Sequence, residues 1–134
     1  MGQYGKAAIR AWKLFTEGSA ETPRKAWEQA IPEFTDSQSS QEKECPRFVF
    51  LALCEEGCLK GIEEGDYVGW ERRNRLYAPN KQCALQAVEE LRKDSSLADS
   101  KKRLWAIVGK GQSDTNGQMD VVLALWVDCL LCKK

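Results

Sequence analysis

The sequence predicts an all-α fold, a compact bundle of about six helices with one long loop between the third and fourth. Apolar residues recur at helical spacing through most of the 134 residues. Glycine and proline fall mainly where these stretches begin or end, and strands are expected to be few or none. No linker is long enough to separate two cores, so residues 1–134 are expected to form a single domain.

The first two helices are predicted between residues 4 and 34. The first ends at Gly18, and its apolar face consists of Tyr4, Ala7, Ala8, Ala11, Leu14 and Phe15. Thr22 is a suitable N-cap for the second helix, with Pro23 at the first helical position. Its apolar stripe from Trp27 to Phe34 contains Pro32, which must bend or end it.

A polar loop is expected over residues 35–44, with Ser39 and Glu42 as a weaker alternative helix start. The third helix follows from Cys45 and ends near Gly57. It is apolar on nearly every side, which is typical of a buried central helix. Residues 61–80 are predicted to be a long surface loop, with a short hairpin over 67–77 as the alternative.

Three further helices complete the predicted bundle. Asn80 is the expected cap of the fourth, which Asp94 ends. The fifth extends from Leu97 to Val108. Asn116 is the expected cap of the last helix, which continues to Leu130. The third and sixth helices are expected to be innermost because they are the most apolar.

Composition excludes several classes of function. The chain has no histidine, which removes every mechanism that needs an imidazole base or ligand. Its 20 basic and 20 acidic residues balance, so no overall field attracts nucleic acid or anionic lipid. No signal core and no apolar run of membrane-spanning length is present, so we expect a cytoplasmic protein with reduced cysteines and no membrane contact.

Two cysteine pairs are the first candidates for chemistry. Cys54 and Cys58 have helical spacing, and Cys129 and Cys132 form a Cys-Leu-Leu-Cys stretch. Four thiolates could hold zinc, and either pair could act as a redox pair, but both pairs lie in apolar helical stretches rather than in tight polar turns, and no βαβ pattern surrounds Cys129. Core packing is therefore the favoured interpretation, and neither a metal nor another cofactor is expected.

The predicted long loop contains the best candidate binding surface. Its aromatic and basic residues alternate, a combination that suits phosphates, nucleotides or acidic peptides: Tyr67, Trp70, Arg72, Arg73, Arg75 and Tyr77. The simpler interpretation is that the aromatic side chains pin the loop to the core. Trp12 is a further candidate contact, because it lies on the shoulder of the first helix's apolar face.

These features favour a non-catalytic helical module that binds a protein partner or a second copy of itself. Nucleic-acid binding through Arg72, Arg73 and Arg75, helped by Arg24 and Lys25, is the alternative. A small enzyme using carboxylates or a thiolate is a further alternative. The polar stretch 116–120 precedes a buried helix, where a small site could form, although capping explains it more simply.

The chain resembles a family of small uncharacterised bacterial proteins, integron-cassette products among them. The resemblance rests on the stretches 4–8, 22–27, 45–57 and 116–126, which together span most of the chain. It implies an intact fold and a bacterial cytoplasmic setting. The family brings no assigned activity, cofactor or catalytic residue.

Overall fold

The computed structural model describes residues 2–109 and 117–131, and these residues form an all-α fold, as predicted. The α-helices are α1 (Gln3–Thr16), α2 (Pro23–Ala30), α3 (Gln38–Gln41), α4 (Glu44–Glu55), α5 (Tyr77–Lys93), α6 (Lys101–Val108) and α7 (Gln118–Val127). Three 3₁₀ segments accompany them: η1 (Ile31–Glu33), η2 (Gly69–Arg73) and η3 (Ser95–Asp99). Within the described ranges the β-structure is one isolated bridge, between Leu59 and Leu131.

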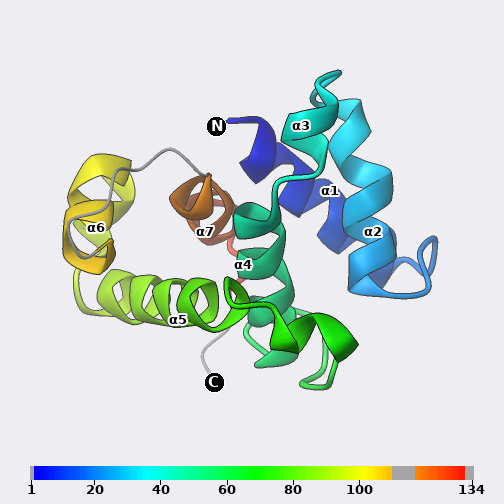
Figure 1. Ribbon diagram of the computed structural model, residues 1–134. Coiled ribbons are helices and arrows are strands. Elements are labelled where there is room, and N and C mark those ends of the chain that lie inside the picture. Colours follow the sequence, from blue (N-terminus) through cyan, green and yellow to red (C-terminus); the bar gives the residue numbers. More distant parts are fainter. Residues whose placement is uncertain (1, 110–116, 132–134) are drawn as a thin grey trace.

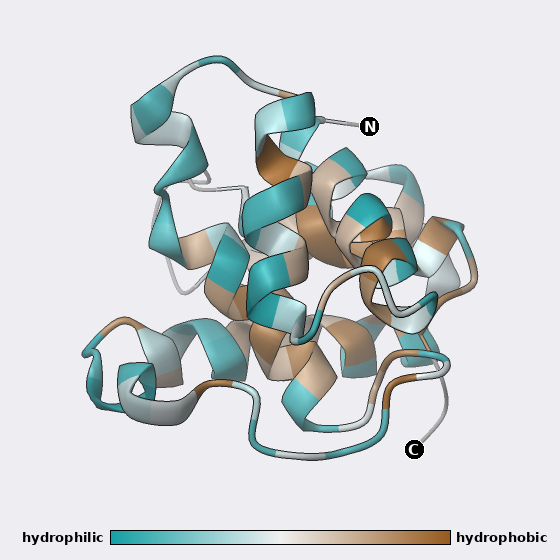
Figure 2. Cartoon of the chain, turned by 90° about the vertical axis from the view of Figure 1, so that its right-hand side faces the viewer, coloured by the Kyte–Doolittle hydropathy of each residue, from teal (hydrophilic) through white to brown (hydrophobic). Residues whose placement is uncertain are grey.

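The two innermost helices are α4 and α7, which confirms the expectation from their composition. In Figure 1, α1, α2 and α3 lie to one side of α4 and α7, and α5 and α6 lie to the other. Every residue of α4 from Phe48 to Cys54 is completely buried. Figure 2 shows that the hydrophobic segments lie mainly in the interior of the protein, whereas much of the peripheral helices is hydrophilic. Each α-helix except α3 contributes to the same hydrophobic cluster.

Most predicted helix ends are confirmed. The side chain of Thr22 accepts a hydrogen bond from the backbone N–H of Lys25, and Pro23 opens α2. Gly18 and Gly57 have φ values of 83° and 69°, in the left-handed region where a helix commonly terminates. Pro32 lies in η1, so it ends the α-helical pattern as expected.

The start of α5 was predicted wrongly. This helix begins at Tyr77, and Asn80 is buried inside it, where its amide donates to the carbonyl of Leu76 at 2.8 Å. Asn74 supplies the turn instead, because its side chain accepts a hydrogen bond from the Leu76 N–H at 2.9 Å. Pro79 is tolerated because a first helical turn needs no N–H from that position.

Three other segments also differ from the prediction. The polar stretch 35–44 contains α3, whose first turn is capped by Ser37. The fifth helix is divided, since the Ser100 side chain caps α6 and separates it from η3. Residues 67–77 contain η2 rather than a hairpin. The predicted cap Asn116 lies outside the described residues, and the residue before α7 is Gly117 with φ 77°.

No helix in the described part of the chain is long and apolar enough to cross a membrane.

Candidate functional site

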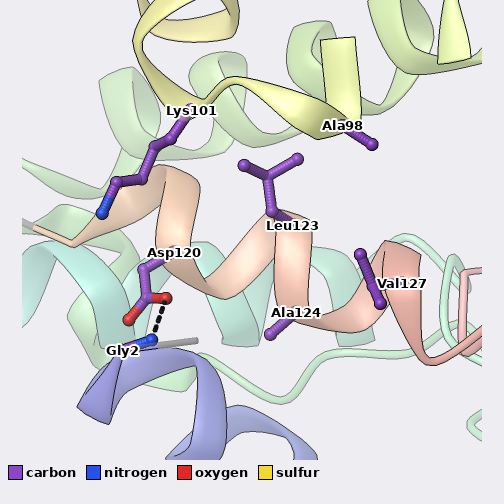
Figure 3. A pocket seen from close by; sticks show the side chains of 7 residues that line it. All are labelled: Gly2, Ala98, Lys101, Asp120, Leu123, Ala124 and Val127. Atoms are coloured by element: carbon purple, nitrogen blue, oxygen red, sulfur yellow. Dashed lines mark hydrogen bonds between the residues drawn. The ribbon is translucent and has the colours of Figure 1, made fainter. Parts of the chain in front are cut away.

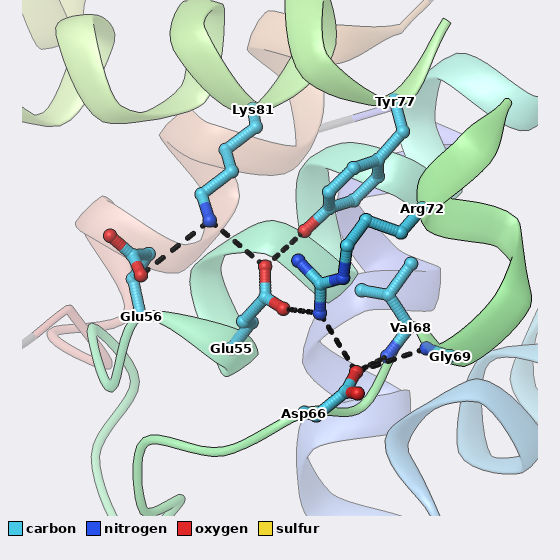
Figure 4. Close-up of polar contacts among 8 residues, drawn as sticks. All are labelled: Glu55, Glu56, Asp66, Val68, Gly69, Arg72, Tyr77 and Lys81. Carbon is cyan, nitrogen blue, oxygen red and sulfur yellow. Dashed lines mark hydrogen bonds and ion pairs between the residues drawn. The ribbon is translucent and has the colours of Figure 1, made fainter. Parts of the chain in front are cut away.

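The segment between α4 and α5 is held against the protein by one buried carboxylate. Glu55, at the end of α4, is 7% exposed. Tyr77 donates its hydroxyl proton to Glu55 at 2.5 Å, Lys81 approaches the same oxygen at 2.9 Å, and Arg72 donates to the other oxygen. Figure 4 shows these three side chains converging on Glu55 from α5 and η2. The cluster thus ties both ends of the segment to α4.

These contacts decide the ionisation of the cluster. Burial opposes the charged form of Glu55, but hydrogen bonds from Arg72, Tyr77 and Lys81 outweigh it and lower the pKa of Glu55 to about 2. Burial and the bond to Glu55 raise the pKa of Tyr77 far above its usual value. A carboxylate whose pKa is lowered, next to a phenol whose pKa is raised, is suited to structural support rather than to proton transfer near neutral pH.

Local turn chemistry positions Arg72. The carboxylate of Asp66 accepts hydrogen bonds from the backbone N–H groups of Val68 at 3.2 Å and Gly69 at 3.0 Å. Gly69 has φ 63°, which lets the chain turn into η2. Asp66 also accepts from Arg72 at 2.8 Å, and its pKa is lowered chiefly by the Gly69 N–H and then by Arg72. The turn and the ion pair therefore reinforce each other (Figure 4).

A second buried carboxylate lies one residue before Arg72. Glu71 is 3% exposed, and its two oxygens form ion pairs with Arg24 of α2 and, at 2.5 Å, with Arg47 of α4. Asn74 donates to Glu44 at 2.5 Å and adds a further link to α4. Neither Glu71 nor Arg47 was predicted from the sequence. The available signal was a single acid inside the basic run 70–75, a position at which a structural ion pair can form.

Trp70, in η2, is a large hydrophobic residue whose side chain is exposed to solvent. It is 75% exposed, and the guanidinium of Arg24 lies 5.4 Å from its ring centroid. This distance is within the range of a cation–π contact. Buried Glu71 forms an ion pair with Arg24, and Arg24 contacts the Trp70 ring. The position of the exposed tryptophan is therefore fixed by contacts with α2.

The structure separates the predicted binding residues into two groups. Tyr77 is buried, Arg72 is engaged by two carboxylates, and half-buried Tyr67 donates to the carbonyl of Glu63 at 2.6 Å. Trp12 is half-buried and donates its indole N–H to the carbonyl of Lys60 at 2.6 Å. The remaining candidates, Trp70, Arg73 and Arg75, are exposed, and neither arginine forms a hydrogen bond or ion pair with a described residue.

The basic residues of α2 are also engaged within the molecule. Arg24 pairs with Glu71, and Lys25 pairs with Glu21 at 3.0 Å on the surface. Both cations are therefore already paired with carboxylates, which disfavours their predicted role in binding phosphates of a nucleic acid.

The cysteines do not form a metal centre within the described residues. Cys54 and Cys58 are buried, and burial together with the proximity of Cys58 raises the pKa of the Cys54 thiol. A thiol in this environment is a poor nucleophile. The backbone of Lys60 donates to the carbonyl of Leu130 at 2.8 Å, which places the segments after Cys58 and Cys129 side by side. Cys132 lies outside the described residues.

Comparison with known proteins identifies the family. A family model described as a family of unknown function, DUF6979, matches residues 1–131. The chain belongs to DUF6979. No curated protein and no solved structure is significantly similar to it. The DUF6979 match covers the two carboxylate clusters and η2, but the description of the family names no activity.

Proposed function

We propose that this DUF6979 protein is a non-catalytic helical module that binds an acidic segment of a protein partner through its η2 surface. The η2 surface is defined as Trp70, Arg73 and Arg75 together with Arg24. The proposal rests mainly on one observation: the Trp70 ring is exposed and contacts Arg24, which is itself held by Glu71. Tryptophan and arginine are the residues most enriched among those that dominate binding energy at protein interfaces.

Charge supports an acidic partner. Glu71 offsets part of the charge of Arg24 and Arg47, and Glu55 and Asp66 engage Arg72. Arg73 and Arg75 have no such carboxylate among the described residues. Their guanidinium groups are thus available to pair with carboxylates of a partner, in the bidentate geometry that arginine favours.

The test is affinity capture with matched variants. The bait is the intact protein, exposed to a lysate of the organism that carries its gene. We expect an acidic protein to be retained by the wild type and by I107A, and lost by W70A and by the R73E/R75E double variant. Ile107 is the matched control because it is a partly exposed hydrophobic residue on α6. Retention of the same proteins by all four baits would contradict the proposal.

Nucleic-acid binding is the second candidate, because the same two arginines could contact phosphates. A fluorescently labelled single-stranded DNA at about 50 mM salt tests it, since phosphate contacts weaken steeply as salt rises. We expect no binding. Salt-sensitive binding that R73E/R75E abolishes would replace the protein partner with a nucleic acid.

A further inference from the structure

A second candidate site lies beside α7 and shares no residue with the η2 surface. A cavity of about 340 Å³ opens between α7, the start of α1 and the η3–α6 junction. Its lining residues are Gly2, Ala98, Lys101, Asp120, Leu123, Ala124 and Val127. This volume is at the lower end of the range typical of small-molecule pockets, roughly 300–1,000 Å³. The cavity therefore suits a small ligand.

One wall of the cavity is apolar because the C-terminal part of α7 consists of hydrophobic residues. Seven consecutive residues of this helix, from Val121 to Val127, carry hydrophobic side chains, and the described residues leave part of this apolar surface exposed. Leu123 is half-buried and Val127 is 59% exposed. Figure 3 shows Leu123, Val127 and Ala98 around the same space. A helix that is hydrophobic all round is ordinarily buried, so this face is suited to contact with an apolar group.

The other end of the cavity carries two opposite charges. Asp120 is 8% exposed, and its oxygens accept the backbone N–H groups of Gly2 at 3.0 Å and Gly5 at 2.8 Å. These donors are neutral, and no cation among the described residues pairs with Asp120. Lys101 extends from α6 toward the same end, but no hydrogen bond or ion pair joins it to Asp120 (Figure 3).

We propose that this cavity binds a small zwitterion with an apolar side chain, an α-amino acid of the size of leucine or phenylalanine. The ammonium group of the ligand pairs with Asp120, since each carboxylate oxygen retains acceptor capacity beyond one N–H bond. The ligand carboxylate pairs with Lys101, and its side chain packs along Leu123 and Val127. A monoanion would face Asp120 without a cation of its own, and a simple amine would face Lys101 without an anion.

The test measures binding of amino acids to the intact protein. Titration of ¹⁵N-labelled protein with leucine and with phenylalanine is expected to shift the amide signals of Asp120, Leu123 and Val127 saturably, with a Kd of about 1 mM or below. Three analogues each remove one contact: N-acetyl-leucine lacks the ammonium, leucinamide lacks the carboxylate and glycine lacks the apolar side chain. Each is expected to bind at least about tenfold more weakly.

Variants locate the site. K101M is expected to weaken leucine binding by at least about tenfold, and K102M, a matched change at the neighbouring exposed lysine, is expected to leave it unchanged. V127D places a charge on the exposed part of the apolar wall and is expected to abolish binding without unfolding the protein, as thermal denaturation would verify. Equal binding of leucine and N-acetyl-leucine, equal binding by K101M and K102M, or no saturable shift with either amino acid would overturn the proposal. None of these outcomes depends on a protein partner for the η2 surface.

Discussion

The protein buries carboxylates in two regions and satisfies them in different ways. On the η2 side, Glu55 and Glu71 are surrounded by side-chain cations and a phenol from η2, α2, α4 and α5. At the junction of α1, α6 and α7, Asp120 is held by two neutral backbone N–H groups, and a cavity opens beside it. The first arrangement uses its charges to assemble the fold, whereas the second leaves a charge available to a ligand.

The largest effect is expected at the more deeply buried carboxylate of the η2 side. E71Q leaves the guanidinium groups of Arg24 and Arg47 without their ion-pair partner, and Arg47 is only 16% exposed. Removing one partner of a buried ion pair is strongly destabilising, so we expect a loss of about 4 kcal/mol in the free energy of unfolding.

Chemical denaturation measures this loss. E33Q is the control, because Glu33 forms its ion pair with Arg10 on the surface, and it is expected to lose no more than about 0.5 kcal/mol. Similar losses for E71Q and E33Q would show that the η2 side does not depend on its buried charge.

Acid is expected to weaken the η2 side through Glu55. The pKa of this carboxyl is about 2 in the folded protein, below the ordinary value of 4.5, so its contribution is complete above pH 4.5 and is lost as the pH falls toward 2. A shift of this size corresponds to about 3 kcal/mol.

The check is to measure the free energy of unfolding from pH 6 to pH 2 for the wild type and for E55Q. The wild-type curve is expected to fall toward the E55Q curve as the pH decreases, because glutamine has no charge to lose. Parallel curves would assign the acid sensitivity to other groups.

On the Asp120 side, the close approach of backbones is expected to matter more than charge. A Cβ on Gly5 would lie 2.7 Å from the Ala124 Cβ and 2.9 Å from the Asp120 carbonyl oxygen, so α1 and α7 would have to separate. We expect G5A to lose about 2 kcal/mol in the free energy of unfolding, as measured by chemical denaturation.

G65A is the control, since the nearest atoms to its new Cβ belong to the Tyr67 side chain, at 3.5 Å, and a loss below about 0.5 kcal/mol is expected. If G5A is as stable as G65A, the close contact between α1 and α7 does not contribute to the stability of the fold.

The contrast between the two regions also explains what the sequence could and could not predict. Periodicity located α1, α2, α4 and α7, because apolar faces and caps such as Thr22 are local signals. It could not place Asn80, whose partner Gln118 lies 38 residues away, or show that Glu71 reaches α2 and α4. The alternation of aromatic and basic residues predicted a binding surface over residues 66–77, but Tyr67, Arg72 and Tyr77 form contacts within the protein that the pattern did not indicate.

A smaller effect is expected from the phenol that supports Glu55. Y77F removes one hydrogen bond to a charged group but leaves Arg72 and Lys81 in place, so a loss of about 1.5 kcal/mol is expected. Y67F serves as the control, because the Tyr67 hydroxyl bonds to a backbone carbonyl near the surface, and its loss is expected to be about 0.5 kcal/mol. Urea denaturation of the two variants distinguishes them, and equal losses would mean that Glu55 does not require the phenol.

The smallest effect on stability is expected at Trp70, the residue on which the proposed partner contact rests. Trp70 is 75% exposed, so W70A removes little buried surface and is expected to change the free energy of unfolding by less than about 0.5 kcal/mol. Its contact with Arg24 adds little, because exposed cation–π pairs contribute weakly and Glu71 still holds the arginine. Thermal and urea denaturation measure the change. A loss of 2 kcal/mol or more, in the range of a buried side chain, would mean that Trp70 belongs to the fold like Tyr77. If the stability is unchanged, the fold does not need the Trp70 side chain. This is the result expected if the exposed ring serves for contact with a partner.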